Sequence, residues 1–358
     1  MMNKSKRIRI AILVASAASV ACDEYQVAYY QDYENPQDPQ EQVLIGAPSG
    51  KNIGGGGNYL EAVDQDDATL VVSSYEELKQ AIADASTGDI IYVPEGVEID
   101  ATGQDSLIVD KAITIASSRG FKGGEGALIF TNSDDTFGLF RITAMDVRVT
   151  GFRILGADGE IGESAYGTPL SSAFEVLSAR TEIDNCEISH FSYTAVRFDN
   201  RLTEDSFHHV HHNAIHHIRR TGLGYGVTLN NAEALIEYNY FEKNRHAVAG
   251  TGLPRTSYEA RFNVVGEGYQ GGGHTFDMHR MEENPGEFPN NTIAGTYIHI
   301  HHNTVLDSFD RAVYIRGRAL KSVEIHHNFF TGESVDSEIL LFTKENVSYY
   351  ENRVLPAP

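Results

Sequence analysis

The sequence predicts an all-β protein, a parallel β-helix in which short strands stack as successive coils of a solenoid behind an N-terminal capping α-helix. Asparagine recurs through the second half at spacings of 24 to 28 residues, with one interval of 40. An apolar residue stands three positions before most of these asparagines. A period in the twenties combined with strand-type alternation is typical of stacked β coils. The asparagines are Asn185, Asn213, Asn239, Asn263, Asn303, Asn328 and Asn352.

The repeated asparagine predicts a structural ladder. At a sharp bend, an asparagine side chain can hydrogen-bond to its own chain and to the neighbouring coil. A column of them would satisfy backbone groups that no sheet hydrogen bond reaches. We therefore expect the asparagines to support the fold and not the chemistry.

The first residues are typical of an export signal. Four basic residues among the first nine precede a short apolar stretch over residues 10–21, which is too short to span a membrane. We predict a signal peptide over residues 1–21 and export from a bacterial cell. Ser19-Val-Ala-Cys22 resembles the lipobox of bacterial lipoproteins, and the only other cysteine is Cys186. We expect Cys22 to be lipidated and to anchor the protein at the cell envelope; secretion after ordinary cleavage behind Ala21 is the alternative.

The charge of the chain restricts its partners. Removal of the four positive charges in residues 1–21 would lower the formal net charge from −22 to −26. Nucleic acid and anionic membrane surfaces are therefore excluded as general partners, and membrane contact is expected only through the lipid anchor. An acidic protein that acts on an anionic ligand must concentrate its cations in one cleft. We expect the protein to be a monomer.

The chain divides into a tether and a folded domain. Residues 22–58 are acidic and glycine-rich and predict a disordered tether. Residues 59–358 form the predicted β-helix domain. Ser73 to Glu77 predicts a helix start with a capping box, which would cover the open first coil. The apolar face of this helix would hold Tyr75, Leu78, Ala81, Ile82 and Ala85.

Short strand-like runs follow the predicted helix, before the asparagines begin. They are separated by Gly, Asp and Ser turns. The long interval between Asn263 and Asn303 predicts a loop over Met281 to Ala294 that is inserted into the solenoid, where such loops commonly line a binding site. The runs are Ile90–Val93, Leu107–Val109, Ile113–Ile115, Leu139–Thr143 and Val147–Ile154.

Strand alternation sorts the residues that precede each asparagine. Positions two and four before it point outward and form two rows along the helix, spaced by about 4.8 Å per coil. Such His and Glu rows could bind a transition metal, but stacked, hydrogen-bonded side chains need no ion. We expect coil packing to explain most of these histidines. The rows are His211, Glu237, Arg261, His301 and His326, and His209, Leu235, Glu259, His299 and Glu324.

A second set of strands, about ten residues after each asparagine, carries the candidate site. Its outward residues include arginine, aspartate and histidine, which gives the local cationic patch that an anionic ligand would require. Pairing of Asp199 with Arg197, or of Asp277 with Arg316, is the structural alternative. The outward set is Arg197, Asp199, Thr228, Asn230, Asp277, His279, Tyr314 and Arg316, with Arg220, Arg245, His246, His274 and Arg311 at the strand entrances.

Two segments resemble a known family. His301-His-Asn303, followed after seven residues by Arg311-Ala-Val-Tyr-Ile-Arg316, is similar to the HHN…RxPxxR stretch of pectate lyases. The segment from Glu182 to Ser189 resembles their WIDHCxxS stretch. More generally, residues 70 to 356 resemble the pectin-lyase-like right-handed parallel β-helix proteins. Val313 stands in place of the proline of that motif.

The resemblance implies a polysaccharide lyase that cleaves a uronic-acid-containing polysaccharide by β-elimination. It assigns Arg311 as the base and Arg316 as a substrate-binding residue. His246 and His279 are alternative bases, because a histidine titrates nearer neutrality. Proton abstraction beside a carboxylate requires neutralising charge, and Ca²⁺ held by Asp199 and Asp277 could supply it.

We expect an acidic polysaccharide as the partner of this protein. Three hypotheses describe what the protein does with it. The first is the lyase, with catalytic residues Arg311, His279, His246 and Asp277. The second is a glycoside hydrolase on the same fold, with Asp199, Asp277, Glu259 or a loop glutamate as acid and base. The third is a non-catalytic carbohydrate-binding β-helix. The substrate-binding residues would be Arg316, Tyr314, Arg245, Arg197, Asn230 and His274.

Overall fold

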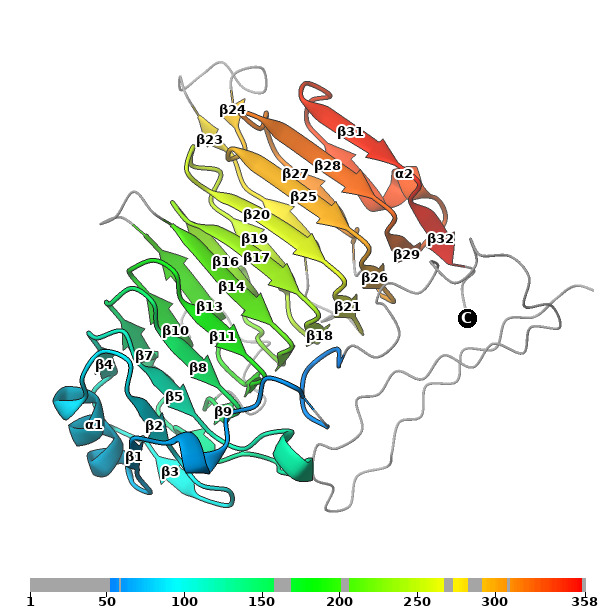
Figure 1. Ribbon diagram of the computed structural model, residues 1–358. Helices are drawn as coiled ribbons and strands as arrows, with labels where there is room; N and C mark the ends of the chain where they lie inside the picture. The colour runs from blue at the N-terminus through cyan, green and yellow to red at the C-terminus, as the bar shows by residue number, and fades with distance from the viewer. Residues whose placement is uncertain are drawn as a thin grey trace, which may run out of the picture.

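The computed structural model is a right-handed parallel β-helix, as the sequence predicts (Figure 1). It describes residues 52–57, 59–157, 169–200, 206–266, 273–282, 292–307 and 310–355. The predicted signal peptide over 1–21 and Cys22 lie outside the described residues and stay predictions. Among the helices of the described part, none is long and apolar enough to cross a membrane.

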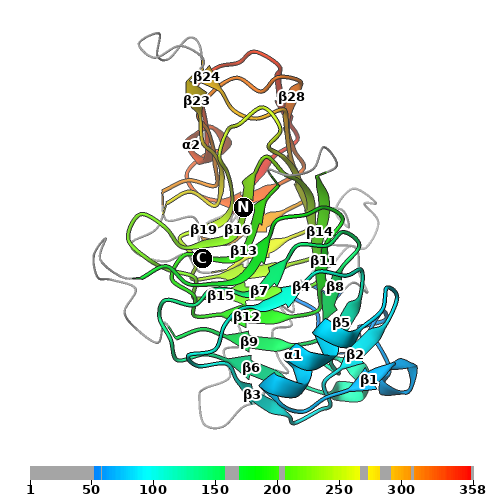
Figure 2. The same ribbon diagram turned by 90° about the vertical axis from the view of Figure 1, so that its left-hand side faces the viewer.

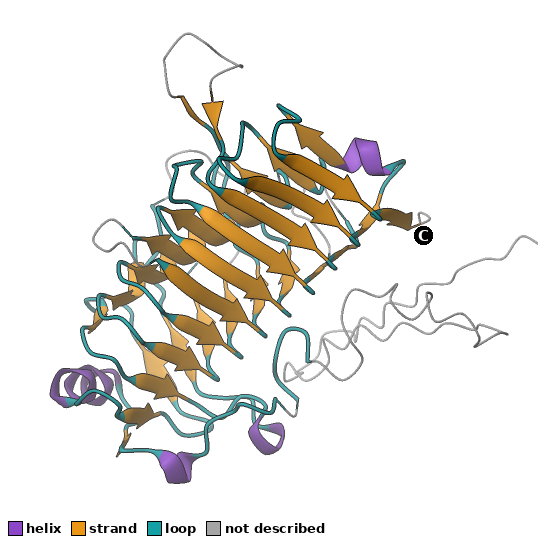
Figure 3. Cartoon of the chain, turned by 45° about the horizontal axis from the view of Figure 1, so that its top comes forward, coloured by secondary structure: helices purple, strands orange, loops and turns teal. Residues whose placement is uncertain are grey.

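Each coil contributes one strand to each of three parallel sheets, which run side by side along the helix axis (Figures 1 and 3). Sheet 1 holds β1 (Leu70–Val71), β2 (Ile90–Tyr92), β5 (Thr114–Ala116), β8 (Arg148–Thr150), β11 (Glu182–Asp184), β14 (Phe207–His211), β17 (Glu233–Glu237), β20 (Ser257–Arg261), β25 (Tyr297–His301), β28 (Ser322–His326) and β31 (Val347–Tyr350).

The other two sheets repeat the same order of coils. Sheet 2 holds β3 (Glu98–Asp100), β6 (Leu128–Phe130), β9 (Arg153–Leu155), β12 (Glu187–Ser189), β15 (Ala214–His216), β18 (Tyr240–Glu242), β21 (Val264–Val265), β26 (Thr304–Val305), β29 (Phe329–Thr331) and β32 (Arg353–Leu355). Sheet 3 holds β4 (Leu107–Val109), β7 (Phe137–Ile142), β10 (Ser172–Val176), β13 (Thr194–Asp199), β16 (Tyr225–Asn230), β19 (His246–Gly250), β22 (Phe276–Met278), β27 (Val313–Ile315) and β30 (Ile339–Leu341).

The core consists of apolar stacks that run along the inside of the solenoid. Parallel pairing aligns the same strand position in successive coils, so inward residues lie directly above one another. In sheet 1 this register stacks residues that are fully or almost fully buried. Burial of each Val or Ile side chain stabilises the folded state by about 1.5–3 kcal/mol. One such stack is Ile183, Val210, Ile236, Ala260, Ile300 and Ile325.

The predicted helix caps the first coil. Helix α1 (Tyr75–Asp84) begins after Ser74, whose hydroxyl accepts a hydrogen bond from the backbone N–H of Glu77. The side chain of Glu77 accepts in turn from the backbone of Ser73. The five residues predicted for its apolar face are all buried, and α1 lies at the N-terminal end beside β2 and β4 (Figure 2). The short helix α2 (Val335–Glu338) precedes β30.

The structure divides one predicted strand and locates the base of the inserted loop. The run Val147–Ile154 is two strands, β8 and β9, because Gly151 turns the chain with φ 79°. The inserted loop leaves the solenoid through an antiparallel pair, β23 (Met281–Glu282) and β24 (Thr292–Ile293). Residues 283–291 lie outside the described residues, and they include Glu283 and Glu287, two of the loop glutamates predicted as hydrolase candidates. The third, Glu282, ends β23.

The end of the predicted tether packs on the solenoid. Residues 52–57 and 59–64, here named the N-terminal strap, cross the bend between sheets 1 and 2. The backbone N–H of Gly54 donates to the carbonyl of Tyr238 at 2.9 Å, and that of Gly56 donates to Asn185 Oδ1 at 2.8 Å. The predicted boundary between tether and domain at residue 58 stays a prediction; the structure shows that Gly54 and Gly56, which precede it, hydrogen-bond to the solenoid.

A close backbone approach explains the glycines of the N-terminal strap. Gly55 has φ 70°, and a Cβ there would lie 2.2 Å from the carbonyl oxygen of His212. The strap is also held by Arg119, whose Nη1 donates to the Gly54 carbonyl at 3.0 Å. The phenol of Tyr59 donates to Asp184 Oδ2 at 2.9 Å, which holds the second part of the strap on sheet 1.

The asparagine ladder is present from Asn213 to Asn352. The backbone N–H and the Nδ2 of each asparagine before Asn352 donate to Oδ1 of the asparagine in the next coil at 2.9 to 3.1 Å. Each Nδ2 also donates to a carbonyl of the preceding coil, as Asn263 does to Ile236 at 2.8 Å. The ladder therefore joins coils through the bend, where no sheet hydrogen bond runs.

Asn185 does not belong to this ladder. The register of β12 and β15 places Cys186, not Asn185, above Asn213, and the backbone N–H of Cys186 donates to Asn213 Oδ1. Asn185 occupies the left-handed position one residue earlier, at φ 52°, and binds the N-terminal strap instead. Cys186 is a free, buried thiol, and burial raises its pKa to about 12.

Replacement of Asn263 by Ala should lower the free energy of unfolding by about 3 kcal/mol, because it leaves several buried donors and acceptors without partners. Chemical denaturation of the purified protein measures this change. Asn352→Ala is the matched control at the partly exposed end of the ladder and should cost less. Equal losses in the two variants would contradict a ladder that works through burial.

Candidate functional site

The predicted outward residues line the surface of sheet 3 in the expected register. Arg197 pairs with Thr228, Thr228 with Ala249, Ala249 with Asp277, and Asp277 with Tyr314. Successive coils thus carry these side chains in one row along the helix. The neighbouring row begins with Asp199 and Asn230.

Asp277 is the centre of the candidate site. It lies on β22 with a fully buried carboxylate, although its strand position points away from the core. Arg316, beyond the end of β27, forms a two-pronged ion pair with it, and its Nε lies 3.0 Å from Oδ1. Burial alone would raise the pKa of Asp277, but the hydrogen bond from His279 and the nearby His and Arg cations lower it to about 2. The carboxylate is therefore ionised at neutral pH.

His279 is the accessible histidine of this site. Its Nε2 lies 3.3 Å from Asp277 Oδ2, and 40% of its side chain is exposed. A carboxylate that accepts the Nε2 proton fixes the tautomer and leaves the Nδ1 lone pair available. A buried aspartate that orients a half-exposed imidazole is an arrangement suited to proton transfer.

His246 is packed behind Asp277. Its side chain is fully buried, with Nε2 3.9 Å from Asp277 Oδ2. Nδ1 contacts the carbonyl of His274, and Nη1 of Arg245 lies 2.6 Å from Nε2. Burial lowers the pKa of His246 to about 3, so the ring is neutral. The predicted role of His246 as a base is not supported by this geometry, because no part of the ring reaches the surface.

A third group extends the site toward the entrance of β27. His274 Nδ1 lies 3.1 Å from Asp310 Oδ2, and its ring packs edge-on against Tyr314 with centroids 4.2 Å apart. The guanidinium of Arg316 lies 4.5 Å from the Tyr314 ring centroid. Arg311 pairs with its neighbour Asp310 at 3.4 Å and is partly exposed. The structure therefore gathers eight predicted site residues in one patch: Arg245, His246, His274, Asp277, His279, Arg311, Tyr314 and Arg316.

Arg197, Asp199 and Asn230 form a separate cluster. Arg197 pairs with Asp199 and with Glu175, and Asn230 Nδ2 donates to Asp199 Oδ1 at 2.7 Å. Three coil steps separate this cluster from Asp277, about 14 Å along the axis. Asp199 and Asp277 therefore cannot hold one Ca²⁺ ion between them, contrary to the prediction.

Carboxylates neutralise most of the predicted cationic patch. The pairs Arg197–Asp199 and Arg316–Asp277, foreseen as the structural alternative, both form. Around Asp277, the guanidinium group of Arg316 pairs with Asp277 and that of Arg311 pairs with Asp310. The sequence predicted the pairs with Asp199 and Asp277 as the structural alternative, but it did not predict the pairing of Arg311 with Asp310.

Two contributing residues escaped prediction. Tyr225 stacks on His246 with ring centroids 5.1 Å apart and an interplanar angle of 7°, and covers the buried ring. Asp310 bridges His274 and Arg311. Counting coils would have found Tyr225, since it pairs in register with His246. Asp310 lies in a turn, where strand alternation gives no signal.

No protein-family model matches the chain, and no curated protein matches it. Among solved structures it is similar to the alginate lyase from Paenibacillus sp. str. FPU-7, at 14% identity and TM-score 0.44, over 80% of this chain and 95% of that one. It is also similar to the PL6 family alginate lyase AlyGC, at 15% identity and TM-score 0.27, over 81% of this chain. The chain spans about half of AlyGC, 52% of its length. These similarities concern the β-helix, and neither substrate nor mechanism follows from them.

Replacement of Asp277 by Asn should destabilise the protein by about 3–5 kcal/mol, because it leaves Arg316 beside a buried group without charge. Denaturant unfolding measures the loss. Asp310→Asn, which removes a carboxylate that is 44% exposed, should cost less than about 1 kcal/mol. If Asp277→Asn lowered the free energy of unfolding by no more than Asp310→Asn does, the buried ion pair of Asp277 would not be important for stability.

The pH dependence of stability should report the neutral His246. Its folded pKa of about 3 lies below the ordinary value of 6.5, so the unfolded chain binds more protons between these values. Stability is therefore lost as the pH falls from 6.5 toward 3. In His246→Gln the slope of unfolding free energy against pH should be smaller by about 1.4 kcal/mol per pH unit in this window. An unchanged slope would mean that the folded protein protonates this ring.

Proposed function

We propose that the protein is a polysaccharide lyase that cleaves a uronic-acid-containing polymer by β-elimination, with His279 as the base. The observation that carries the proposal is the accessible His279 held by the buried carboxylate of Asp277. The partly exposed imidazole lies at the surface of sheet 3, where the outward rows offer a polar track along the axis. An extended polymer can lie on that track.

The elimination step uses residues that already touch one another. His279 takes the proton from C5 of the uronate, beside its carboxyl group. The electrons form the C4=C5 double bond as the C4–O glycosidic bond breaks, and the departing oxygen takes a proton from the imidazolium. Asp277 stabilises the positive charge on His279 during this cycle.

The substrate carboxylate must be neutralised for the proton to leave. Arg311 and Arg316 lie on either side of Tyr314 in sequence, and both are about one quarter exposed, at 28% and 25%. Arg311 Nε is buried with no hydrogen-bond partner within the described chain. These guanidinium groups supply the charge that was also expected from calcium.

The donor set does not favour a calcium ion at the predicted ligands. Asp199 Oδ1 accepts from Asn230 and Oδ2 contacts Arg197. Both oxygens of Asp277 contact Arg316. Carboxylates engaged in this way are poor calcium ligands, so the arginines are the better-supported electrophiles.

The hydrolase alternative has weaker support. Hydrolysis requires two carboxyl groups within about 10 Å of each other, one of them protonated. Asp199 and Asp277 are about 14 Å apart along the axis, and Asp277 has a lowered pKa. Glu259 lies on β20 of sheet 1, away from this surface.

Incubation with alginate, pectate and glycosaminoglycans should yield unsaturated, ultraviolet-absorbing ends with one of these polymers. His279→Gln should lower that rate by about 10²- to 10⁴-fold, the range for loss of a general base. His299→Gln is the matched control on sheet 1 and should keep the wild-type rate.

Product mass separates the alternatives, since elimination and hydrolysis products differ by one water. Products that carry the extra water would select the hydrolase. Binding without any product would select the carbohydrate-binding protein. If Arg311→Ala abolishes elimination while His279→Gln retains it, Arg311 is the base, as the family resemblance implies.

A further inference from the structure

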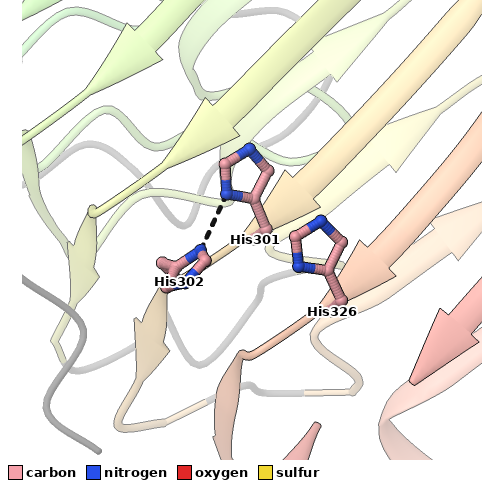
Figure 4. A group of neighbouring side chains, drawn as sticks. All are labelled: His301, His302 and His326. Atoms are coloured by element: carbon pink, nitrogen blue, oxygen red, sulfur yellow. Dashed lines mark hydrogen bonds between the residues drawn. The ribbon is translucent and has the colours of Figure 1, made fainter. Parts of the chain in front are cut away.

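Two successive coils carry the same histidine pair at the same bend. His301-His302 and His326-His327 each precede a ladder asparagine. The pairing of β25 with β28 places His326 directly beside His301. His302 and His327 occupy the left-handed position of their bends, with φ 56° and 55°. Four imidazoles thus form a compact array at the surface, three of which are shown in Figure 4.

The ring nitrogens converge within this array. Nδ1 of His301 lies 2.9 Å from Nδ1 of His302, and ligand nitrogens of His301, His302 and His326 all lie within 4.8 Å of one another. Adjacent ligands of one ion with metal–nitrogen bonds of about 2.0–2.1 Å stand roughly 3 Å apart. The His301–His302 pair already has that separation, and His326 stacks parallel to His301 at 4.7 Å.

Neighbouring carboxylates orient the imidazoles. Nε2 of His301 lies 3.2 Å from Glu259 Oε1, and Nε2 of His327 contacts Glu351. A carboxylate that accepts the Nε2 proton leaves Nδ1 free to act as a ligand, the usual support of metal-bound histidine. Nδ1 of His326 also lies 2.9 Å from Nδ1 of His327, which places the fourth ring in reach.

We propose that His301, His302 and His326 bind one divalent transition-metal ion of the Cu²⁺, Ni²⁺ or Zn²⁺ class, with His327 as a further ligand. Imidazole nitrogens select these ions over Ca²⁺ and Mg²⁺, which take oxygen ligands. The site clamps two coils on sheet 1, away from the Asp277 site on sheet 3.

Other clusters in the described chain lack this combination. His211 and His212 have the same close pair, but the next coil presents Glu237 and Tyr238. Glu61, Glu182 and His211 are near one another, yet Arg148 lies 3.4 Å from Glu182 and neutralises it. The array at residues 301–327 is therefore the strongest metal site among the residues that the structure describes.

Titration of the untagged full-length protein with Cu²⁺ tests the proposal, by calorimetry and by electron paramagnetic resonance. We expect one tight ion per chain, a signal split by at least three nitrogens, and no competition from Ca²⁺. Loss of a residue that only hydrogen-bonds a metal ligand weakens metal binding roughly 10- to 100-fold. The double variant His302→Asn with His326→Gln removes two ligands, so it should weaken Cu²⁺ binding by at least this factor. Asparagine suits the left-handed position, which Asn185 occupies in an earlier coil.

His217→Asn is the matched control. His217 has φ 56°, and its Nδ1 lies 2.8 Å from that of His216, but this pair forms no three-ligand group within the described residues. It should retain wild-type Cu²⁺ affinity. Equal weakening in both variants, or absence of a tight wild-type ion, would overturn the proposal. Thermal unfolding in chelator verifies that both variants fold.

Discussion

The buried asparagine ladder is the interaction on which the regular part of this solenoid depends. Sheet hydrogen bonds join coils only along the strands, and each bend leaves backbone donors and acceptors inside the helix. The ladder satisfies them with a single residue type, and the left-handed residue before each asparagine turns the chain by the same amount in every coil. Because the bends repeat, the strands of all three sheets keep one register.

That register determines what the surface can do. A residue type repeated at one coil position becomes a column of like side chains, as in the histidine array. Different residues at one position become a mixed row, as in the strip from Arg197 to Tyr314. Both surfaces arise from the same spacing between coils. Residues about 25 positions apart in the sequence lie side by side on adjacent coils and can form one site. The loop inserted between β23 and β24 interrupts this spacing.

The sequence was a good guide wherever alternation and period operate. It predicted the coils, the capping helix and the inward and outward faces of sheets 1 and 3, and both predicted rows of sheet 1 are in register. The prediction that Asn185 belongs to the ladder was wrong. Asn185 stands one residue before the ladder position, and a shift of one residue cannot be recognised from spacings that vary between 24 and 28. The sequence patterns also missed Glu175 as a partner of Arg197 and Asp310 as the partner of Arg311, since pairing depends on which rotamers meet across coils and turns. The export signal and the lipidation of Cys22 stay predictions.

The N-terminal strap has a consequence for the order of folding. Its partners Asn185 and Tyr238 are synthesised much later than the strap, and Gly56 is 129 residues from Asn185 in sequence. During synthesis the strap cannot bind until those coils have been made and have stacked, because its partners do not exist before then. The first described residues of the chain are thus among the last to be secured. In the finished protein they connect the early coils, through Arg119 and Asn185, to the coils that carry the ladder, through Tyr238.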